Sequence, residues 1–135
     1  MFRVWKGSLV LALVSCLLVT TVTFAQYADS STVQVTTNAT LGQILTDGNG
    51  MTLYVFAKDA PGVSNCTGGC LAAWPALTVP AGTTPTAGSG AAGTLGTITR
   101  SDNGELQVTY DNKPLYRFGS DTAAGEASGE GVAGV

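Results

Sequence analysis

The side chains with the clearest capacity for chemistry are two cysteines, Cys66 and Cys70, separated by Thr-Gly-Gly. In a small domain outside the cytosol such a pair predicts a disulfide, and the glycines give the backbone freedom to bring the Cβ atoms together. A metal site of this kind would need four nitrogen or sulfur ligands. Redox-active pairs usually have the shorter spacing Cys-x-x-Cys. We therefore predict a structural disulfide, with a redox-active pair as the alternative.

A second set of reactive side chains belongs to a motif, Tyr-x-Phe-x-x-Asp, that occurs at residues 54–59 and 116–121. On a strand the tyrosine and phenylalanine rings point to one face and suit a core. The aspartate just beyond can accept hydrogen bonds from the backbone of a turn, or from a tyrosine hydroxyl of the other copy. We predict a structural role for the motif residues and for the tryptophan between the copies: Tyr54, Phe56, Asp59, Tyr116, Phe118, Asp121 and Trp74.

The alternative for the motif is a cleft shared by the two copies. There the carboxylates of Asp59 and Asp121 could bind a cation or serve as acid and base, and glycoside chemistry would require them to lie within about 10 Å of each other. The stretches that begin at Asp47 and Asp102 lack the further ligands of an EF-hand calcium loop, so turns explain them more simply.

The absence of histidine narrows the enzymatic options. The chain has none, which removes the commonest general base, the commonest metal ligand and any Ser-His or Cys-His pair. We therefore expect no catalytic residues, no cofactor and no metal site.

The first 25 residues have the layout of a secretory signal peptide. Arg3 and Lys6 precede an uncharged apolar run over residues 8–20, and a small-x-small sequence that ends at Ala25 predicts a cut there. The run is short for a membrane span, and an uncleaved anchor is the lesser alternative. A lipobox-like Leu-Val-Ser-Cys sequence ends at Cys16, where lipidation would hold the domain at a membrane. We favour cleavage after Ala25, because the apolar run continues past Cys16.

Removal of this leader leaves an acidic domain. Four Lys and Arg residues remain against nine Asp and Glu residues, which gives a net charge of −5. Binding to nucleic acid depends on clustered cations, so we exclude nucleic acid as a partner. Contact with a membrane is expected only through the signal peptide or a lipid anchor.

Alternation of apolar and polar residues predicts an all-β domain. Turn sequences rich in Gly, Asn and Asp separate the candidate strands, which cover residues 33–37, 42–46, 51–56, 94–100, 105–110 and 115–118. Residues 70–74 can form one or two helical turns, halted by Pro75. Residues 78–93 are rich in Gly, Ala, Thr and Pro, which indicates a flexible connection.

The two sets of strands are copies of one unit. Residues 33–59 align with residues 95–121 at an offset of 62 without a gap, and the match is closest over Leu-Tyr-x-Phe-x-x-Asp. A unit of this size cannot bury its apolar face alone. We predict two three-stranded antiparallel units packed as a small sandwich or barrel. The predicted layout is a signal peptide (1–25), a polar lead (26–32), a duplicated β domain (33–121) and a Gly-rich tail (122–135). The β domain comprises repeat 1 (33–59), the cysteine loop and linker (60–94) and repeat 2 (95–121).

These segments resemble a known family, the predicted bacterial lipoproteins with a Tyr-x-aromatic-x-x-Asp motif, a secreted repeat of unknown function. The resemblance covers about residues 40–134, and the matching segments are 53–59, 64–70 with Trp74-Pro75, 107–110, 113–118 with Asp121, and 129–132. It implies an extracytoplasmic location and often a lipid anchor, and it supplies no catalytic residues. Family members usually continue past the last Gly-Val stretch into a strand with tryptophan, so we expect an open sheet edge or a place for a partner strand.

These observations favour a non-enzymatic module of the cell envelope or the secreted fraction. We expect its partner to be an envelope protein or a surface polymer, and its location to be secreted, periplasmic or anchored at the cell surface. The alternative is an extracytoplasmic redox or electron-transfer protein that uses Cys66 and Cys70. A hydrolase that uses Asp59 and Asp121 is a third hypothesis.

Overall fold

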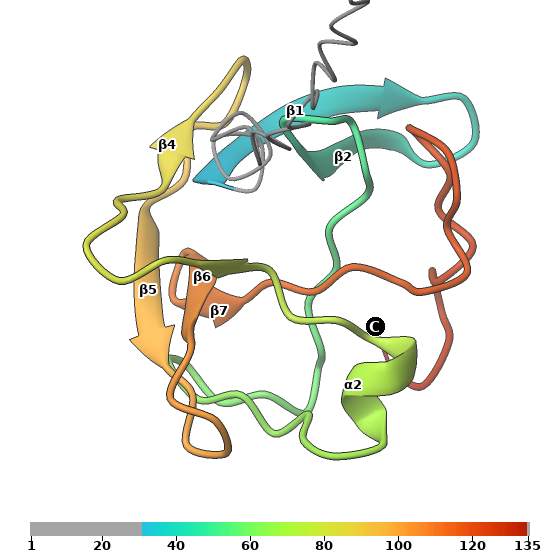
Figure 1. Cartoon of the computed structure of the whole chain (residues 1–135). Coiled ribbons are helices and arrows are strands. Elements are labelled where there is room, and N and C mark those ends of the chain that lie inside the picture. Colours follow the sequence, from blue (N-terminus) through green and yellow to red (C-terminus); the bar gives the residue numbers. More distant parts are fainter. Residues whose placement is uncertain (1–30, 135) are drawn as a thin grey trace, which may run out of the picture.

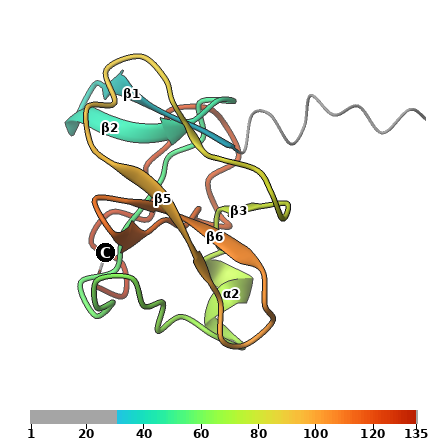
Figure 2. The same cartoon turned by 90° about the vertical axis from the view of Figure 1, so that its left-hand side faces the viewer.

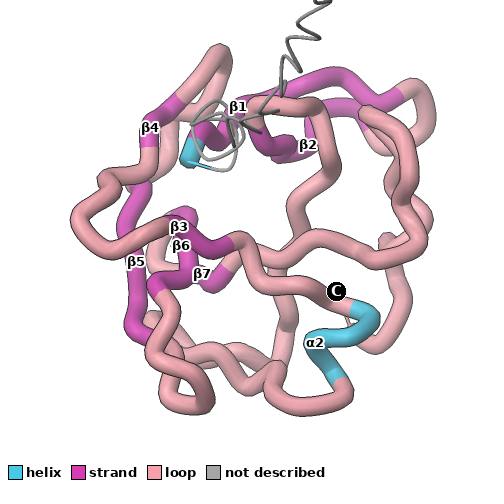
Figure 3. Tube along the Cα trace, viewed as in Figure 1, coloured by secondary structure: helices cyan, strands magenta, loops and turns pink. Residues whose placement is uncertain are grey.

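The computed structural model describes residues 31–134, so the predicted signal peptide, the cut after Ala25 and the lipidation candidate Cys16 lie outside the described residues. The elements of the described part are β1 (Thr32–Asn38), β2 (Gly42–Asp47), α2 (Cys70–Ala73), β3 (Thr78–Val79), β4 (Thr86–Ala87), β5 (Leu95–Thr99), β6 (Leu106–Tyr110) and β7 (Lys113–Pro114). The predicted all-β class is confirmed, with a short helix just before Pro75 (Figures 1 and 3). Over residues 31–134 no helix is long and apolar enough to cross a membrane.

The first sheet combines repeat 1 with one strand from the linker. β1 and β2 form an antiparallel hairpin, in which Val33 pairs with Asp47 and Val35 with Leu45. β4 joins the other edge of β1 in parallel. The linker also supplies β3, which pairs with β6. The stretch 78–93, whose composition indicates flexibility, is thus held to both repeats by backbone pairing.

The second sheet has the order β3-β6-β5, and β7 also pairs with β6. β5 and β6 form the antiparallel hairpin of repeat 2, in which Leu95 pairs with Tyr110 and Thr97 with Val108. Figure 2 shows the β1–β2 hairpin at the top of the molecule and the β5–β6 hairpin below it. Each repeat therefore contributes one hairpin to a separate sheet, and this hairpin is two of the three antiparallel strands predicted for the repeat.

The two repeats meet where their motif segments cross. Tyr54 and Tyr116 form an antiparallel bridge, in which the N–H of each residue donates to the carbonyl oxygen of the other, at 2.8 and 2.9 Å. The third strands expected at 51–56 and 115–118 are correspondingly reduced to isolated bridges, and the two-residue strand β7 lies just before the second of these stretches. The motif backbone joins the repeats to each other and does not extend a regular strand within each repeat.

The structural match between the repeats contains one register shift. Val33 corresponds to Leu95 at the expected offset of 62, but the residues that face them, Asp47 and Tyr110, are 63 apart. The loop of the second hairpin is one residue longer than that of the first, and the turn after β6 is one residue shorter than the turn after β2. The offset between the two copies of the motif is therefore 62 again. An ungapped alignment is therefore wrong for the middle strand, where a slip of one residue exchanges the two faces.

The core has an aliphatic side and an aromatic side. The aliphatic cluster draws on both repeats and on β3, and its buried members are Val33, Leu53, Leu77, Val79, Val108 and Leu115. The aromatic cluster holds Tyr54, Tyr116, Trp74 and Cys66, with Phe56 and Phe118 packed against it. Successive side chains of an extended segment point to opposite faces, so Leu53 and Tyr54 enter different clusters, as do Leu115 and Tyr116. Because both repeats supply both clusters, neither repeat has a core of its own.

Candidate functional site

The tyrosines of the motif donate hydrogen bonds to the aspartates of the opposite repeat. The Tyr54 hydroxyl donates to Asp121 Oδ2 at 2.5 Å, and the Tyr116 hydroxyl donates to Asp59 Oδ2 at 2.6 Å. Both tyrosines are buried, at 5 % and 0 % exposure. The crossing of the two motif segments places each hydroxyl beside the far end of the other segment. The result is a reciprocal pair of Tyr–Asp contacts, one on each side of the crossing.

Each motif aspartate also holds the loop that follows it. Asp59 Oδ1 accepts the backbone N–H of Asn65 at 2.7 Å. Asp121 Oδ1 accepts the backbone N–H of Ser128 at 2.9 Å and its hydroxyl at 2.6 Å. The two contacts considered from the sequence, with a backbone amide and with the opposite tyrosine, therefore occur together on the two oxygens of one carboxylate.

Burial and these carboxylates keep both tyrosines protonated. Loss of water around the ring and, to a smaller extent, the hydrogen bond to Asp59 together raise the pKa of Tyr116 to about 12. Burial likewise raises the pKa of Tyr54, again with a contribution from the hydrogen bond to Asp121. A neutral phenol is a good hydrogen-bond donor to a carboxylate and a poor base, so the geometry suits a fixed contact better than proton transfer at neutral pH.

Trp74 lies at the centre of the aromatic cluster. Its ring centroid is 5.4 Å from that of Tyr54, 5.0 Å from that of Phe56 and 4.5 Å from that of Phe118. The indole is 3 % exposed. Mutual ring contacts of this kind stabilise a core by about 0.5–1.5 kcal/mol for each pair beyond the area buried. Trp74 thus ties the cysteine loop to the motif segments of both repeats.

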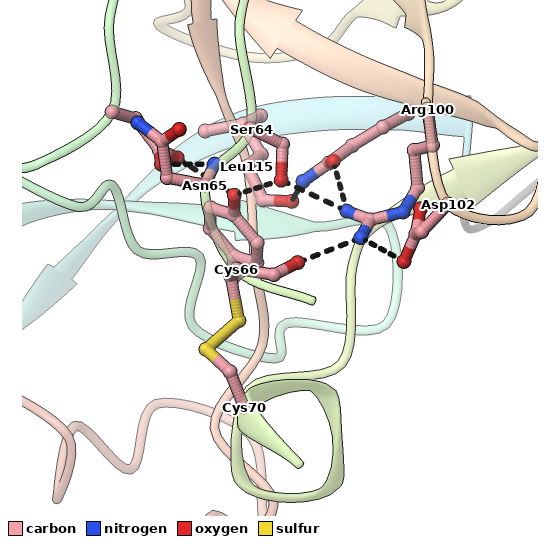
Figure 4. Close-up of a disulfide and its surroundings, with 10 residues drawn as sticks. Ser64, Asn65, Cys66, Cys70, Arg100, Asp102 and Leu115 are labelled. Carbon is pink, nitrogen blue, oxygen red and sulfur yellow. Dashed lines mark hydrogen bonds and ion pairs between the residues drawn. A yellow bond between two sulfur atoms is a disulfide. The ribbon is translucent and has the colours of Figure 1, made fainter. Parts of the chain in front are cut away.

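The predicted disulfide is present. Cys66 and Cys70 are bonded, with their Cα atoms 5.4 Å apart, and Cys66 is buried while Cys70 begins helix α2 (Figure 4). The carbonyl oxygen of Cys66 accepts a hydrogen bond from Arg100 at 2.7 Å. The disulfide is therefore connected to repeat 2 through the backbone of the residue that forms it.

Arg100 is a central residue that sequence reasoning missed. Its guanidinium donates to Gln107 Oε1 at 2.7 Å and to Ser64 Oγ at 3.0 Å, and it forms an ion pair with Asp102 at 2.8 Å. Arg100 is 3 % exposed although it carries a charge. The position that corresponds to it at an offset of 62 is Asn38, which donates to the Gly125 carbonyl oxygen. A lone arginine after a strand does not stand out in a sequence. The signal that could have identified Arg100 is that the equivalent position of repeat 1 holds an asparagine.

A second missed contact is the ion pair between Arg117 and Asp47, at 2.5 Å, in which the Asp47 side chain has no exposure. Asp47 Oδ1 also accepts the backbone N–H groups of Asn49 and Met51. The turn interpretation of the stretch that begins at Asp47 agrees with these contacts. Over residues 31–134 no three His, Cys, Asp or Glu side chains are grouped so as to hold a metal ion.

The surroundings of the two Tyr–Asp pairs differ. Asp121 is 7 % exposed, and the nearby Gly129 packs so closely that a Cβ there would stand 2.8 Å from the Trp74 ring. Asp59 instead borders a cavity of about 230 Å³, whose lining residues are Phe56, Lys58, Asp59, Asn65, Cys66, Cys70, Trp74 and Ala133. The same motif therefore forms a closed corner in one repeat and an open corner in the other.

Comparison with known proteins agrees with this duplicated architecture. A family model described as a secreted repeat of unknown function matches the chain twice, over residues 35–78 and 96–135. No curated protein and no solved structure matches. Each match begins within two residues of the start of a predicted repeat and extends beyond its end, and the first includes the cysteine loop and Trp74. The chain belongs to this family of secreted repeats, which makes it an extracytoplasmic protein.

Proposed function

We propose that the chain is a non-enzymatic module of the cell envelope, which binds an envelope protein or a surface polymer. The single observation that carries this proposal is the engagement of the motif's reactive groups in fixed contacts. Both carboxylate oxygens of Asp59 and of Asp121 accept hydrogen bonds from their own chain, and each tyrosine hydroxyl donates to one of them. Groups held in this way suit a rigid frame that presents surfaces, since a catalytic acid or base must be free to exchange protons with a substrate.

The test is capture of partners from the native envelope. The full chain, tagged and with its disulfide intact, is used as bait for detergent-solubilised envelope fractions, and the matched control is the same chain reduced and alkylated at Cys66 and Cys70. We expect a defined protein or glycan that is retained by the oxidised bait and displaced by untagged chain. Turnover of an envelope polymer by the purified chain, without any captured partner, contradicts the proposal.

The finer location is part of the same proposal. Cleavage after Ala25 would release the domain, whereas acylation of Cys16 would anchor it. We propose release, because the apolar run extends beyond Cys16. Mass spectrometry of the natively produced chain decides: a mature N-terminus at Gln26 is the expected result, and a diacylated or triacylated Cys16 contradicts it.

One observation favours a second candidate, thiol–disulfide chemistry. Both cysteines line the 230 Å³ cavity, so the disulfide borders space that a thiol of a partner could enter. A staple in a secreted protein is expected to have a reduction potential below about −300 mV. Equilibration with glutathione buffers, followed by alkylation and mass spectrometry of Cys66 and Cys70, measures it. A reduction potential near −200 mV would support a redox function. A value below about −300 mV would support a structural disulfide in a binding module.

A further inference from the structure

The open corner has three features that point to one class of ligand. The first is a fixed negative charge at one side of the cavity, the Asp59 carboxylate, whose position is set by the Tyr116 hydroxyl and the Asn65 amide at 2.6 and 2.7 Å. Each carboxylate oxygen can accept more than one hydrogen bond. A ligand that donates to Asp59 therefore need not displace the contacts that hold the fold.

The second feature is the aromatic lining. Phe56 and Trp74 both border the cavity, with ring centroids 5.0 Å apart. Trp74 is 3 % exposed, so the more accessible ring is that of the half-buried Phe56, and a cation near its face would gain about 0.5–2 kcal/mol. Both cysteines of the disulfide line the same cavity and add a polarisable apolar surface. Rings and a carboxylate around one small space favour an organic cation with an apolar body over a neutral or anionic ligand.

The third feature is the charge of the whole domain. With nine acidic residues against four cations after the leader, the molecule attracts cations and repels anions. Lys58 at the rim opposes this locally, but its side chain is exposed, and long exposed lysines are mobile and well solvated. The ammonium of Lys58 competes with a cationic ligand, which predicts that its removal strengthens binding.

We infer that the open corner between Phe56, Asp59, Trp74 and the Cys66–Cys70 disulfide is a binding site for a small organic cation, an amine or quaternary ammonium with an apolar body. At about 230 Å³ the cavity is smaller than the 300–1,000 Å³ typical of drug-sized ligands. It fits one amine-bearing group, either free or as part of a larger molecule. This inference rests on the proposed binding function, for which it names a ligand class.

The experiment titrates the full, oxidised chain with three probes of matched shape: benzylamine, benzyl alcohol and benzoate. Binding is followed by calorimetry and by the NMR shift of the Trp74 indole N–H. We expect benzylamine to bind at least about fivefold more tightly than either other probe, as expected for one desolvated charge interaction. Equal binding of benzylamine and benzyl alcohol, or tighter binding of benzoate, overturns the inference.

Two pairs of variants locate the site. Asp59→Asn should weaken benzylamine binding about fivefold or more, whereas Asp121→Asn breaks the equivalent Tyr–Asp pair in the closed corner and should leave binding unchanged. Lys58→Gln should strengthen binding, whereas Lys113→Gln, in repeat 2, should not. If Asp59→Asn fails to fold, the comparison of Lys58→Gln with Lys113→Gln still tests the site. An affinity of Lys58→Gln for benzylamine that is unchanged or weaker contradicts a cation site.

The outcomes separate this inference from the proposed function. Capture of an envelope partner with no preference for benzylamine overturns the cation site and leaves the binding module standing. Cation binding at the open corner, together with turnover of an envelope polymer and no captured partner, contradicts the proposed function and retains the site.

Discussion

At the scale of single residues, the Tyr–Asp pairs explain why the motif contains the residue types that it does. Phenylalanine would fill the same space as Tyr54 or Tyr116, but only a hydroxyl can satisfy a carboxylate at the end of the opposite segment. The aspartate in turn has two oxygens, one for the tyrosine and one for the amide of its own loop. A duplicated motif can thus hold its two copies together through contacts that neither copy can make alone.

Removal of one hydroxyl tests this account. We expect Tyr116→Phe to lower the free energy of unfolding by about 1.5–3 kcal/mol, the range for a hydrogen bond to a charged group. In a double-mutant cycle with Asp59→Asn the two effects should be strongly non-additive, since both substitutions act on the Tyr116–Asp59 contact, although Tyr116→Phe also removes the contact with Ser64. Urea denaturation measures both quantities. Additive effects would mean that the Tyr116–Asp59 contact does not contribute to stability.

The raised pKa of Tyr116 predicts a loss of stability in alkali. Below pH 10 the phenol is neutral in the folded and unfolded chains, and the contact is fully present. Between pH 10 and about 12 the unfolded chain ionises first, because its pKa is lower, so the free energy of unfolding falls by about 3 kcal/mol over this window. Denaturation at stepped pH should show this fall. Tyr116→Phe should reduce the slope of the free energy of unfolding against pH in this window. An unchanged slope contradicts the assignment of this fall to Tyr116.

At the scale of elements, the closed corner depends on a glycine. The Cα of Gly129 lies so near the indole that an added Cβ would stand 2.8 Å from Trp74 and 3.0 Å from Phe118. We expect Gly129→Ala to destabilise the fold by about 1–3 kcal/mol through overpacking. The control is Gly69→Ala, where φ is −61° and no atom lies within 4 Å of the added Cβ; its effect should stay within about 0.5 kcal/mol. Equal stabilities by thermal denaturation would contradict this packing.

The cysteine loop is an element fixed from two directions, by its disulfide and by Arg100. The short span between Cys66 and Cys70 limits the chain-entropy contribution of the disulfide to about 2 kcal/mol. Arg100 donates to Ser64 and to the Cys66 carbonyl oxygen, and its charge is buried.

We expect Arg100→Met to cost about 2–5 kcal/mol, because it leaves the buried Gln107 Oε1 and the Cys66 carbonyl oxygen without their donor. Reduction of the disulfide alone should cost less. Urea denaturation of the Arg100→Met variant and of the reduced chain compares these two losses in the free energy of unfolding. A larger loss on reduction would mean that the disulfide is the main restraint on the loop.

At the scale of the whole molecule, the two repeats depend on the same two hydrophobic clusters for their stability. The aliphatic cluster joins Val33 and Leu53 of repeat 1 with Val108 and Leu115 of repeat 2. The aromatic cluster is shared in the same way around Trp74. The backbone bridge between Tyr54 and Tyr116 lies between the two clusters.

This arrangement predicts one cooperative unfolding transition. Far-ultraviolet circular dichroism, which reports both sheets, and the NMR signals of the aromatic cluster should give the same midpoint in urea. Val33→Ala in repeat 1 and Val108→Ala in repeat 2 should each move the whole transition without splitting it. Two separate transitions would show that the repeats fold independently and would contradict a shared core.

Much of the fold follows from local pattern. The alternation in residues 33–37 and 105–110 predicts strands that the structure contains as β1 and β6, and Pro75 limits helix α2. The alternation along Leu53 and Tyr54 predicts the aliphatic and aromatic faces. The linker was harder to predict, since Gly, Ala, Thr and Pro have weak strand preference. β3 and β4 are strands because backbone partners on β6 and β1 are available to them.

The sequence by itself determined the all-β class, the duplication, the disulfide and the residues that form the aromatic face. These depend on spacing within a few residues, or on self-similarity. Only the tertiary structure decided that each Tyr pairs with the other copy's Asp, that the middle strands are offset by 63, and that Arg100 and Arg117 are held by buried acceptors. It also decided which corner is closed and which is open. The physical reason is that these features arise from contacts between segments far apart in the chain, and local preference carries no record of which distant partner a side chain will meet.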